Sequence, residues 1–206
     1  LMFIYFSKRR YKSKENKIYS ILIITSFIGV LLELGCRLTI PLLNEIPKTT
    51  FLITKLYLVY LLTWVTLLSL YTFIIVKNPQ SKFKHTKISI IITYIINIII
   101  IFYLPINYYN DGELMYTYGL SVYWVYILSF IYIMISIIKI LLSKTNLKDK
   151  KLIPIIAFII IGTITTIIQL INPGMLLATS METFVTVLMY FTIENPDMKM
   201  LEEVNK

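Results

Sequence analysis

The sequence is poor in the residues from which soluble catalytic and metal sites are built. Its 206 residues include one cysteine and one histidine, and only 15% of them are charged. A single cysteine, Cys36, excludes a disulfide within the chain and a cysteine metal cluster. The signatures HExxH and GxSxG and a glycine-rich phosphate loop are also missing. The sequence therefore predicts no catalytic residue, no cofactor and no metal site in this chain.

Apolar residues are present in excess. They make up 57% of the chain, and the mean hydropathy is +0.76, whereas a soluble domain is about 45–50% apolar. The excess lies in runs of roughly 20 residues, which is the length of helix that spans a bilayer. These runs cover residues 18–43, 52–76, 86–106, 116–142, 152–171 and 175–193.

A shorter apolar stretch, residues 1–6, comes before the first full run and is followed by Lys8, Arg9 and Arg10. A signal peptide carries its charges before its apolar region, so this order does not fit one. We interpret the stretch as the end of a truncated first helix. The sequence thus predicts an all-α integral membrane protein, a bundle of six complete transmembrane helices plus the truncated one, seven in all.

The basic residues predict the orientation of this bundle. The connections richest in lysine and arginine are residues 7–17, 77–87 and 139–151. The alternate connections are poor in them, because residues 44–55 hold only Lys48 and Lys55 and residues 107–115 hold none. Cytoplasmic loops carry an excess of basic residues. We therefore expect the basic connections and the C-terminus in the cytoplasm, and we expect the net charge of +9 to serve orientation rather than nucleic-acid binding.

Three charged residues inside the predicted spans are candidates for a site. A charge there costs a few kcal/mol on insertion scales, about 2.5–3.5 for most, and needs a partner. Glu33 and Arg37 are four residues apart on one helix, so they can pair. Glu182 falls at a similar outer depth on the last helix, and Gln169 could join the same layer. Three interpretations stay open: a salt bridge that fixes helix packing, a ligand or ion site open to the outside, and a proton pathway.

Other polar and aromatic residues have more ordinary explanations. Asn97 stands alone in mid-span and is expected to bond to a neighbouring helix, and His85 is expected in a solvated loop. Aromatic residues gather near the predicted outer ends of two spans, where they form either an interfacial belt or part of a ligand pocket. They are Tyr103, Tyr108, Tyr109, Tyr116, Tyr118, Tyr123 and Trp124.

The C-terminal segment shows the most specific pattern. Asn195-Pro196 closes the last span, because proline disfavours helix at the residue before it. Asp197 then begins a new amphipathic helix, at the end where a carboxylate is favourable. The stretch Ile-Glu-Asn-Pro-Asp over residues 193–197 resembles the junction in a group of Gram-positive, gut-type sensor histidine kinases. Residues 26–37, with Glu33, and residues 56–71, with Trp64, are similar to membrane helices of the same group.

The resemblance implies that residues 1–194 are a transmembrane sensor domain and residues 195–206 the start of a helical linker to an output domain. It implies a bacterial plasma-membrane location, a homodimer, and a response regulator as the cytoplasmic partner. Asn195, Pro196 and Asp197 would then relay the signal. The chain contains no phosphoacceptor histidine or ATP-binding motif, so the kinase activity would belong to the full-length parent protein. The alternative is a small multi-pass transporter or channel.

Overall fold

The computed structural model describes residues 1–7, 14–76, 83–112, 114–142, 152–172, 174–175 and 177–191. This part of the chain is mostly helical and contains seven helices and one hairpin. The elements are α1 (Met2–Ser7), α2 (Lys14–Thr39), α3 (Pro47–Ile75), α4 (Phe83–Tyr103), β1 (Asn107–Asn110), β2 (Met115–Tyr118), α5 (Leu120–Leu141), α6 (Ile153–Ile171) and α7 (Ala178–Met189).

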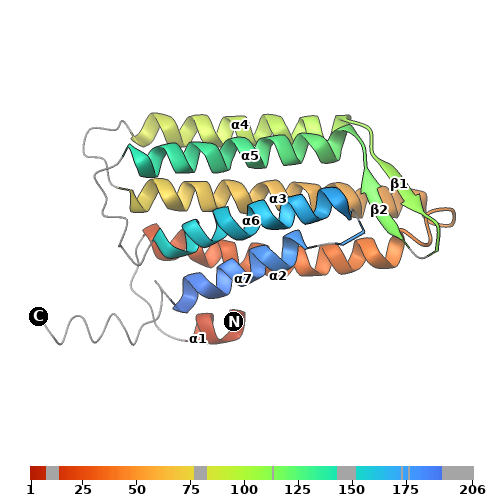
Figure 1. Cartoon of the computed structure of the whole chain (residues 1–206), viewed down its shortest axis with the longest axis horizontal. Coiled ribbons are helices and arrows are strands. Elements are labelled where there is room, and N and C mark those ends of the chain that lie inside the picture. The colour runs from red at the N-terminus through yellow and green to blue at the C-terminus, as the bar shows by residue number, and fades with distance from the viewer. Residues whose placement is uncertain are drawn as a thin grey trace, which may run out of the picture.

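The helices from α2 to α7 lie side by side and run in alternate directions (Figure 1). The turn between α2 and α3 and the hairpin between α4 and α5 therefore lie at the same end of the bundle (Figure 1). The ends of α3, α5 and α7 lie at the opposite end, where α2, α4 and α6 begin.

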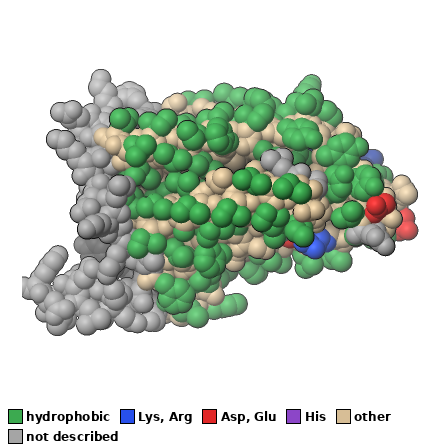
Figure 2. All heavy atoms as spheres, viewed as in Figure 1, with side chains coloured by type: hydrophobic (Ala, Val, Ile, Leu, Met, Phe, Trp, Pro, Cys, Tyr) green, Lys and Arg blue, Asp and Glu red, His purple; other side chains and the backbone are tan. Residues whose placement is uncertain are grey.

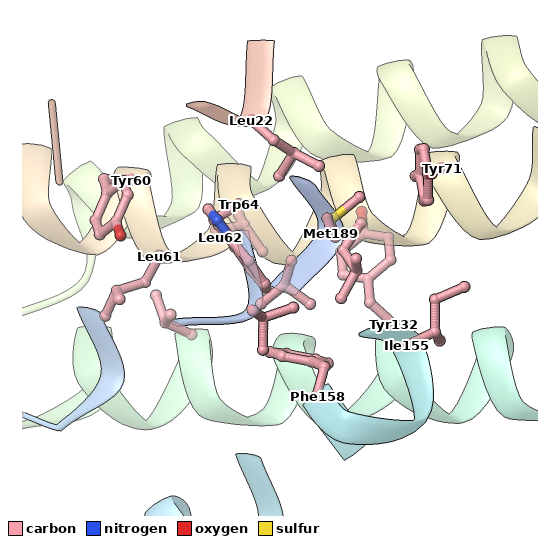
Figure 3. Packing of buried hydrophobic residues seen from close by; sticks show 14 of the residues in the cluster. Leu22, Tyr60, Leu61, Leu62, Trp64, Tyr71, Tyr132, Ile155, Phe158 and Met189 are labelled. Atoms are coloured by element: carbon pink, nitrogen blue, oxygen red, sulfur yellow. The ribbon is translucent and has the colours of Figure 1, made fainter. Parts of the chain in front are cut away.

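Helix α3 is the centre of the bundle and packs against α2, α4, α5 and α7. Its side chains are buried around most of its circumference, as expected for a helix that is apolar on all faces. Trp64 is fully buried at mid-length and packs against Phe158 of α6, with 5.1 Å between the ring centroids. In Figure 3, Trp64 lies among Leu22, Met189 and Phe158, so residues from four helices meet there.

The outer faces of the other helices are apolar. Phe27 of α2, Ile99 of α4, Phe130 of α5 and Ile164 of α6 each expose more than half of their area. Figure 2 shows apolar side chains along the described helices on this face, with charged side chains gathered near the hairpin end. Three helices, α2, α3 and α5, are long and apolar enough to cross a membrane, and α4 and α6 contain shorter apolar stretches.

The hairpin corrects the prediction that the chain is entirely helical apart from loops. Residues 116–118, expected at the start of a span, pair as β2 with β1, and Tyr109 lies opposite Tyr116. Tyrosine and threonine favour strands, and the Asn-Asp-Gly sequence provides the turn, where Gly112 has φ of +92°. Apolar content alone does not distinguish a strand from the first turn of a helix, which is why the sequence analysis missed this element.

Several helix boundaries also differ from the predicted ones. Helix α3 begins at Pro47, which was expected to lie in a loop, because proline fits the first turn of a helix where its missing N–H is not needed. Helix α4 begins at Phe83, which puts the backbone of His85 in a helix rather than in a loop. Helix α7 has only 12 residues, fewer than the roughly 20 that a perpendicular span requires.

Lys55 is the least expected feature of the core. The sequence analysis placed it among the few charges on the outer side, but it is fully buried in α3. Its ammonium donates hydrogen bonds to the carbonyls of Ile101 (2.7 Å) and Leu104 (2.5 Å) and to Ser121 Oγ (3.1 Å). The last carbonyls of α4 lack partners within their own helix, and a cation is favourable at that end of the helix dipole. Lys55 therefore joins α3, the end of α4 and the start of α5.

Replacing this lysine tests its structural role. We expect Lys55→Met to keep the side-chain volume but to remove three hydrogen bonds and leave the Leu104 carbonyl without this donor, while the Ile101 carbonyl still accepts from Ser121 Oγ. The loss should cost about 1–3 kcal/mol. Thermal unfolding of the detergent-solubilised protein measures the loss. Lys48→Met is the matched control, because Lys48 is exposed near the start of the same helix. Equal unfolding temperatures for the two variants would contradict the assignment.

Candidate functional site

A groove between α2 and α7 contains two of the residues predicted to form a site. It encloses about 710 Å³, counting its open mouth, and Glu33 and Arg37 lie along its α2 side. Arg37 Nη2 donates to Glu33 Oε1 at 3.2 Å, so the pairing predicted from their spacing is confirmed. The two partners differ in burial, because the Arg37 side chain is 57% exposed and the Glu33 side chain 15%. The Glu33 carboxylate is therefore part of the wall of the groove, and the Arg37 guanidinium is the more exposed partner.

The α7 side of the groove consists of hydroxyl-bearing residues around Glu182. Thr179, Ser180 and Thr183 line it. Glu182 lies between them in the sequence and is 2% exposed. Thr179, Glu182, Thr183 and Thr186 follow helical spacings of three and four residues, so they form one polar face of α7. This face points into the bundle rather than toward its apolar surroundings.

Tyr60 of α3 is the neighbour of Glu182 across the helix interface. Its hydroxyl is close enough to the carboxyl group for the two to interact electrostatically. Neither Tyr60 Oη nor Glu182 Oε2 has a hydrogen-bond partner within 3.5 Å, but the Tyr60 hydroxyl is close enough to the carboxyl group to be its donor at a longer distance. Glu33 is also near enough to Glu182 for repulsion between the two carboxylates. Glu33 and Arg37 thus line the groove, whereas Glu182 is buried behind the hydroxyl-bearing residues that form its α7 side.

Gly29 of α2 allows the Tyr60 ring to lie next to Glu182. A Cβ atom at this position would lie 1.9 Å from Cζ of Tyr60, so no larger residue fits beside the ring. Glycine here serves close approach between helices, as small residues do at helix interfaces in membranes. Its position therefore determines how closely the Tyr60 ring lies to α2 and how Tyr60 faces α7.

A hydrogen-bond network next to the groove joins α7 to two other helices. Thr186 Oγ1 lies 3.0 Å from Ser26 Oγ of α2 and accepts a bond from Trp64 Nε1 of α3 at 3.3 Å. The same indole donates to Ser26 Oγ at 3.0 Å. Thr186 also donates to the carbonyl of Glu182 at 2.8 Å, and Tyr19 of α2 donates to the carbonyl of Thr186. All these groups are buried, so the network fixes α7 against α2 and α3.

Gln169 lies on a different side of α7 from the groove. Its side chain donates to the carbonyl of Met175 at 3.0 Å and borders a second, small cavity of about 40 Å³ that Tyr57 and Thr117 also line. Tyr57 Oη and Thr179 Oγ1 lie 3.0 Å apart, and each of these residues lines one of the two cavities. This hydrogen-bonded pair therefore stands between Gln169 and the other predicted site residues.

No family model, no curated protein and no solved structure matches this chain.

Two further predictions concern the α4–α5 side of the bundle. Asn97 is buried and accepts a bond from Trp124 Nε1 at 3.1 Å, so it bonds to a neighbouring helix as predicted. The aromatic residues near the hairpin do not line either of the two cavities next to α7. Tyr103 is 91% exposed, and Tyr109 stacks on Tyr116 at 4.9 Å. The nearby Asp111 carboxylate raises the pKa of the Tyr109 phenol.

The proposed relay residues Asn195, Pro196 and Asp197 lie outside the described residues. Tyr60, Thr179, Thr183 and Thr186 were not predicted as site residues. The sequence contains one signal that could have found three of them, since threonines recur at helical spacing around Glu182. Tyr60 had no such signal, because its proximity to Glu182 depends on the packing of α3 against α7.

The contact between Gly29 and Tyr60 is open to a direct test. We expect Gly29→Ala to displace the Tyr60 ring and to lower the free energy of unfolding by about 1–3 kcal/mol, because the added methyl overpacks the interface. Gly162→Ala is the control, since a Cβ there meets its nearest atom at an ordinary 3.6 Å. Thermal unfolding in detergent compares the two. A stable Gly29→Ala protein with unchanged unfolding would show that Gly29 is not needed for this packing.

Proposed function

We propose that this chain is the membrane-embedded input domain of a bacterial two-component sensor histidine kinase. The observation on which the proposal rests is that α7 both lines the groove and leads toward the C-terminal junction. Its polar face forms one wall of the α2–α7 groove and is bonded through Thr186 to α2 and α3. The same helix leads toward residues 193–197, whose sequence resembles the junction of such kinases with their cytoplasmic linker. A signal at the groove would therefore act directly on the helix that leaves the membrane.

The mechanism requires two arrangements of α7 that bind the signal differently. In the described arrangement, Thr186 is bonded to Ser26 and Trp64. A ligand in the groove would contact Thr179, Ser180 and Thr183, which lie one to two turns from that network. Binding that favours a shift or rotation of α7 would change these bonds and move the following linker. Homodimerisation and a response regulator as partner belong to this proposal as implications of the resemblance.

The proposal includes a bacterial plasma-membrane location, with the chain crossing six times and its C-terminus in the cytoplasm. The alternating directions of α2 to α7 support it, as do the apolar outer faces of the helices. Helices α4 and α6 and the predicted span 175–193, of which α7 is the described helical part, would complete the set of spans that α2, α3 and α5 begin. The basic connections would then lie inside and the hairpin outside.

Cysteine labelling tests this topology. In a Cys36→Ala background, we expect Asn110→Cys to react with a membrane-impermeant maleimide on intact cells, because the hairpin would face outward. Ser7→Cys should react only after the cells are permeabilised. Both positions are exposed in the structure, so access to the side chain itself does not limit labelling. Labelling of Ser7→Cys on intact cells would contradict the proposed orientation.

The kinase assignment is tested with the complete gene product that contains this chain. Membranes supplied with labelled ATP should show acid-labile phosphorylation on a histidine. Thr186→Val removes the hydroxyl that joins α7 to α2 and α3, and a hydrogen bond of this kind is worth about 1 kcal/mol. We expect the basal phosphorylation level to rise about fivefold, the change that 1 kcal/mol produces in a two-state equilibrium.

Thr163→Val is the matched control, because the Thr163 hydroxyl donates to the Ile159 carbonyl of its own helix. It should leave phosphorylation unchanged. A product that is not phosphorylated, together with solute flux in liposomes, would replace the sensor proposal with the small transporter or channel. Equal effects of the two substitutions would show that the Thr186 network does not transmit a signal.

A further inference from the structure

The α2–α7 groove has accessible hydrogen-bond donors at one end. Arg37 lies in the last turn of α2 and Ser180 in the first turn of α7, and both line the groove and are exposed. The Arg37 guanidinium has five N–H groups, and among the described residues only Glu33 accepts a bond from it. Within the same part of the chain, the Ser180 hydroxyl makes no hydrogen bond. Both side chains can therefore donate to acceptor oxygens of a ligand.

The lining of the groove has no net charge. Of the described residues that line it, only Glu33 and Arg37 are charged, and they pair with each other at 3.2 Å. A ligand with a net charge would find no opposite charge unless this pair were broken, and breaking a partly buried pair is costly. The groove therefore favours a molecule that has polar acceptors but no net charge.

The other end of the groove is apolar. Helix α2 runs toward the hairpin end of the bundle, so Val30 lies on the side of Arg37 that faces away from the hairpin, about 10 Å along the helix. Val30 and Leu34 line the groove and are 47% and 53% exposed. Thr183 lies on the opposite wall, but its hydroxyl oxygen is buried. The accessible lining therefore changes from polar to apolar with distance from the hairpin.

Two exposed aromatic residues continue this apolar end. Phe27 lies three residues before Val30 on α2, and Phe184 lies four residues after Ser180 on α7, so each lies on the same side of its helix as a lining residue. Each is 51% exposed. In the orientation proposed above, the hairpin end faces outward. The exposed guanidinium near the end of α2 would then reach the outer lipid head groups, and the two aromatic residues would lie among acyl chains.

We propose that the α2–α7 groove binds one glycerolipid of the outer leaflet whose head group has no net charge. Head-group and ester oxygens accept hydrogen bonds from Arg37 and Ser180, and an acyl chain lies along Val30 and Leu34. The order of polar and apolar lining matches the direction in which an outer-leaflet lipid lies, with its head group outward. The inference rests on the proposed function and deepens it, because it names a lipid as the molecule that acts at the groove.

Native mass spectrometry measures this binding on the complete gene product that contains this chain, purified in a mild detergent. The probes are dioleoylphosphatidylcholine, which has no net charge, and dioleoylphosphatidylglycerol, which has the same acyl chains and a negative head group. We expect the first phosphatidylcholine molecule to bind at least tenfold more tightly than the second. The first phosphatidylglycerol molecule should bind no more tightly than the first phosphatidylcholine.

Two tryptophan substitutions on α2 locate the bound lipid. Leu34→Trp fills the groove and should weaken binding of the first phosphatidylcholine at least tenfold. Leu31→Trp is the matched control, because Leu31 is also 53% exposed on the same helix but does not line the groove. It should leave the affinity unchanged. If Leu34→Trp does not fold, Ser180→Leu fills the groove from the opposite wall and should weaken binding similarly.

The diether analogue of phosphatidylcholine tests the hydrogen bond from Ser180, because it has the same head group and chains but no ester carbonyls. The unsubstituted protein should bind the diester about fivefold more tightly than the diether, as expected for one hydrogen bond of about 1 kcal/mol. Ser180→Ala should bind the two lipids equally. Equal binding of the two lipids by the unsubstituted protein would contradict the assigned donor.

Other outcomes would overturn the inference. Equal effects of the two tryptophan substitutions would show that lipid associates with the apolar surface in general. A tenfold preference for phosphatidylglycerol would show a site for anions. A dimer that Leu34→Trp abolishes and Leu31→Trp keeps would assign the groove to a second copy of the chain. Lipid binding at the groove of a gene product without kinase activity would support the inference and contradict the sensor proposal, and histidine phosphorylation without such binding would do the reverse.

Discussion

The hydrogen bonds around Thr186 fix helix α7 against α2 and α3. Helix α7 has only 12 residues, so its own length gives it little stability. Its hydroxyl and carbonyl groups instead bond to Ser26, Trp64 and Tyr19 on two longer helices. In an apolar environment these groups have no water to bond, which makes the pairing between helices the favoured state. The groove, the position of Glu182 and the direction in which α7 leaves the bundle all depend on this contact.

Among the described residues, the two ionisable side chains buried deepest, Lys55 and Glu182, differ in how many hydrogen bonds they make. Lys55 is fully buried and its ammonium has three acceptors, two of them carbonyls at the end of α4. Glu182 is equally inaccessible, but one of its oxygens has no donor. The same desolvation penalty applies to both groups. For Lys55, which is a structural residue, three acceptors within the fold offset this penalty. For Glu182 the polar neighbour is the Tyr60 hydroxyl, although Oε2 itself has no hydrogen-bond partner within 3.5 Å.

Predictions that depended on spacing within one helix agree with the structure. Glu33 and Arg37 pair because side chains four residues apart lie on the same face of a helix. Asn97 accepts a hydrogen bond from Trp124 of α5, as expected for an amide in an apolar span, and it also donates to the Thr93 carbonyl of its own helix. Predictions that depended only on how far a residue lies along its helix were less specific about which residues are neighbours. Gln169 was grouped with Glu182 by its distance along a helix, but the Tyr57–Thr179 pair stands between it and the groove.

The sequence by itself determined that the chain forms long apolar helices, where most of them lie, and which polar residues inside them need partners. These properties follow from composition and from the period of one helix, which are local. The tertiary structure decided which partners those residues have. It placed Tyr60 against Glu182 through Gly29, buried Lys55 at the end of α4, and paired residues 107–110 with 115–118 as a hairpin. Contacts between helices depend on how the helices are rotated relative to one another and on the shapes of the side chains that meet. The spacing of residues within one helix does not determine either of these.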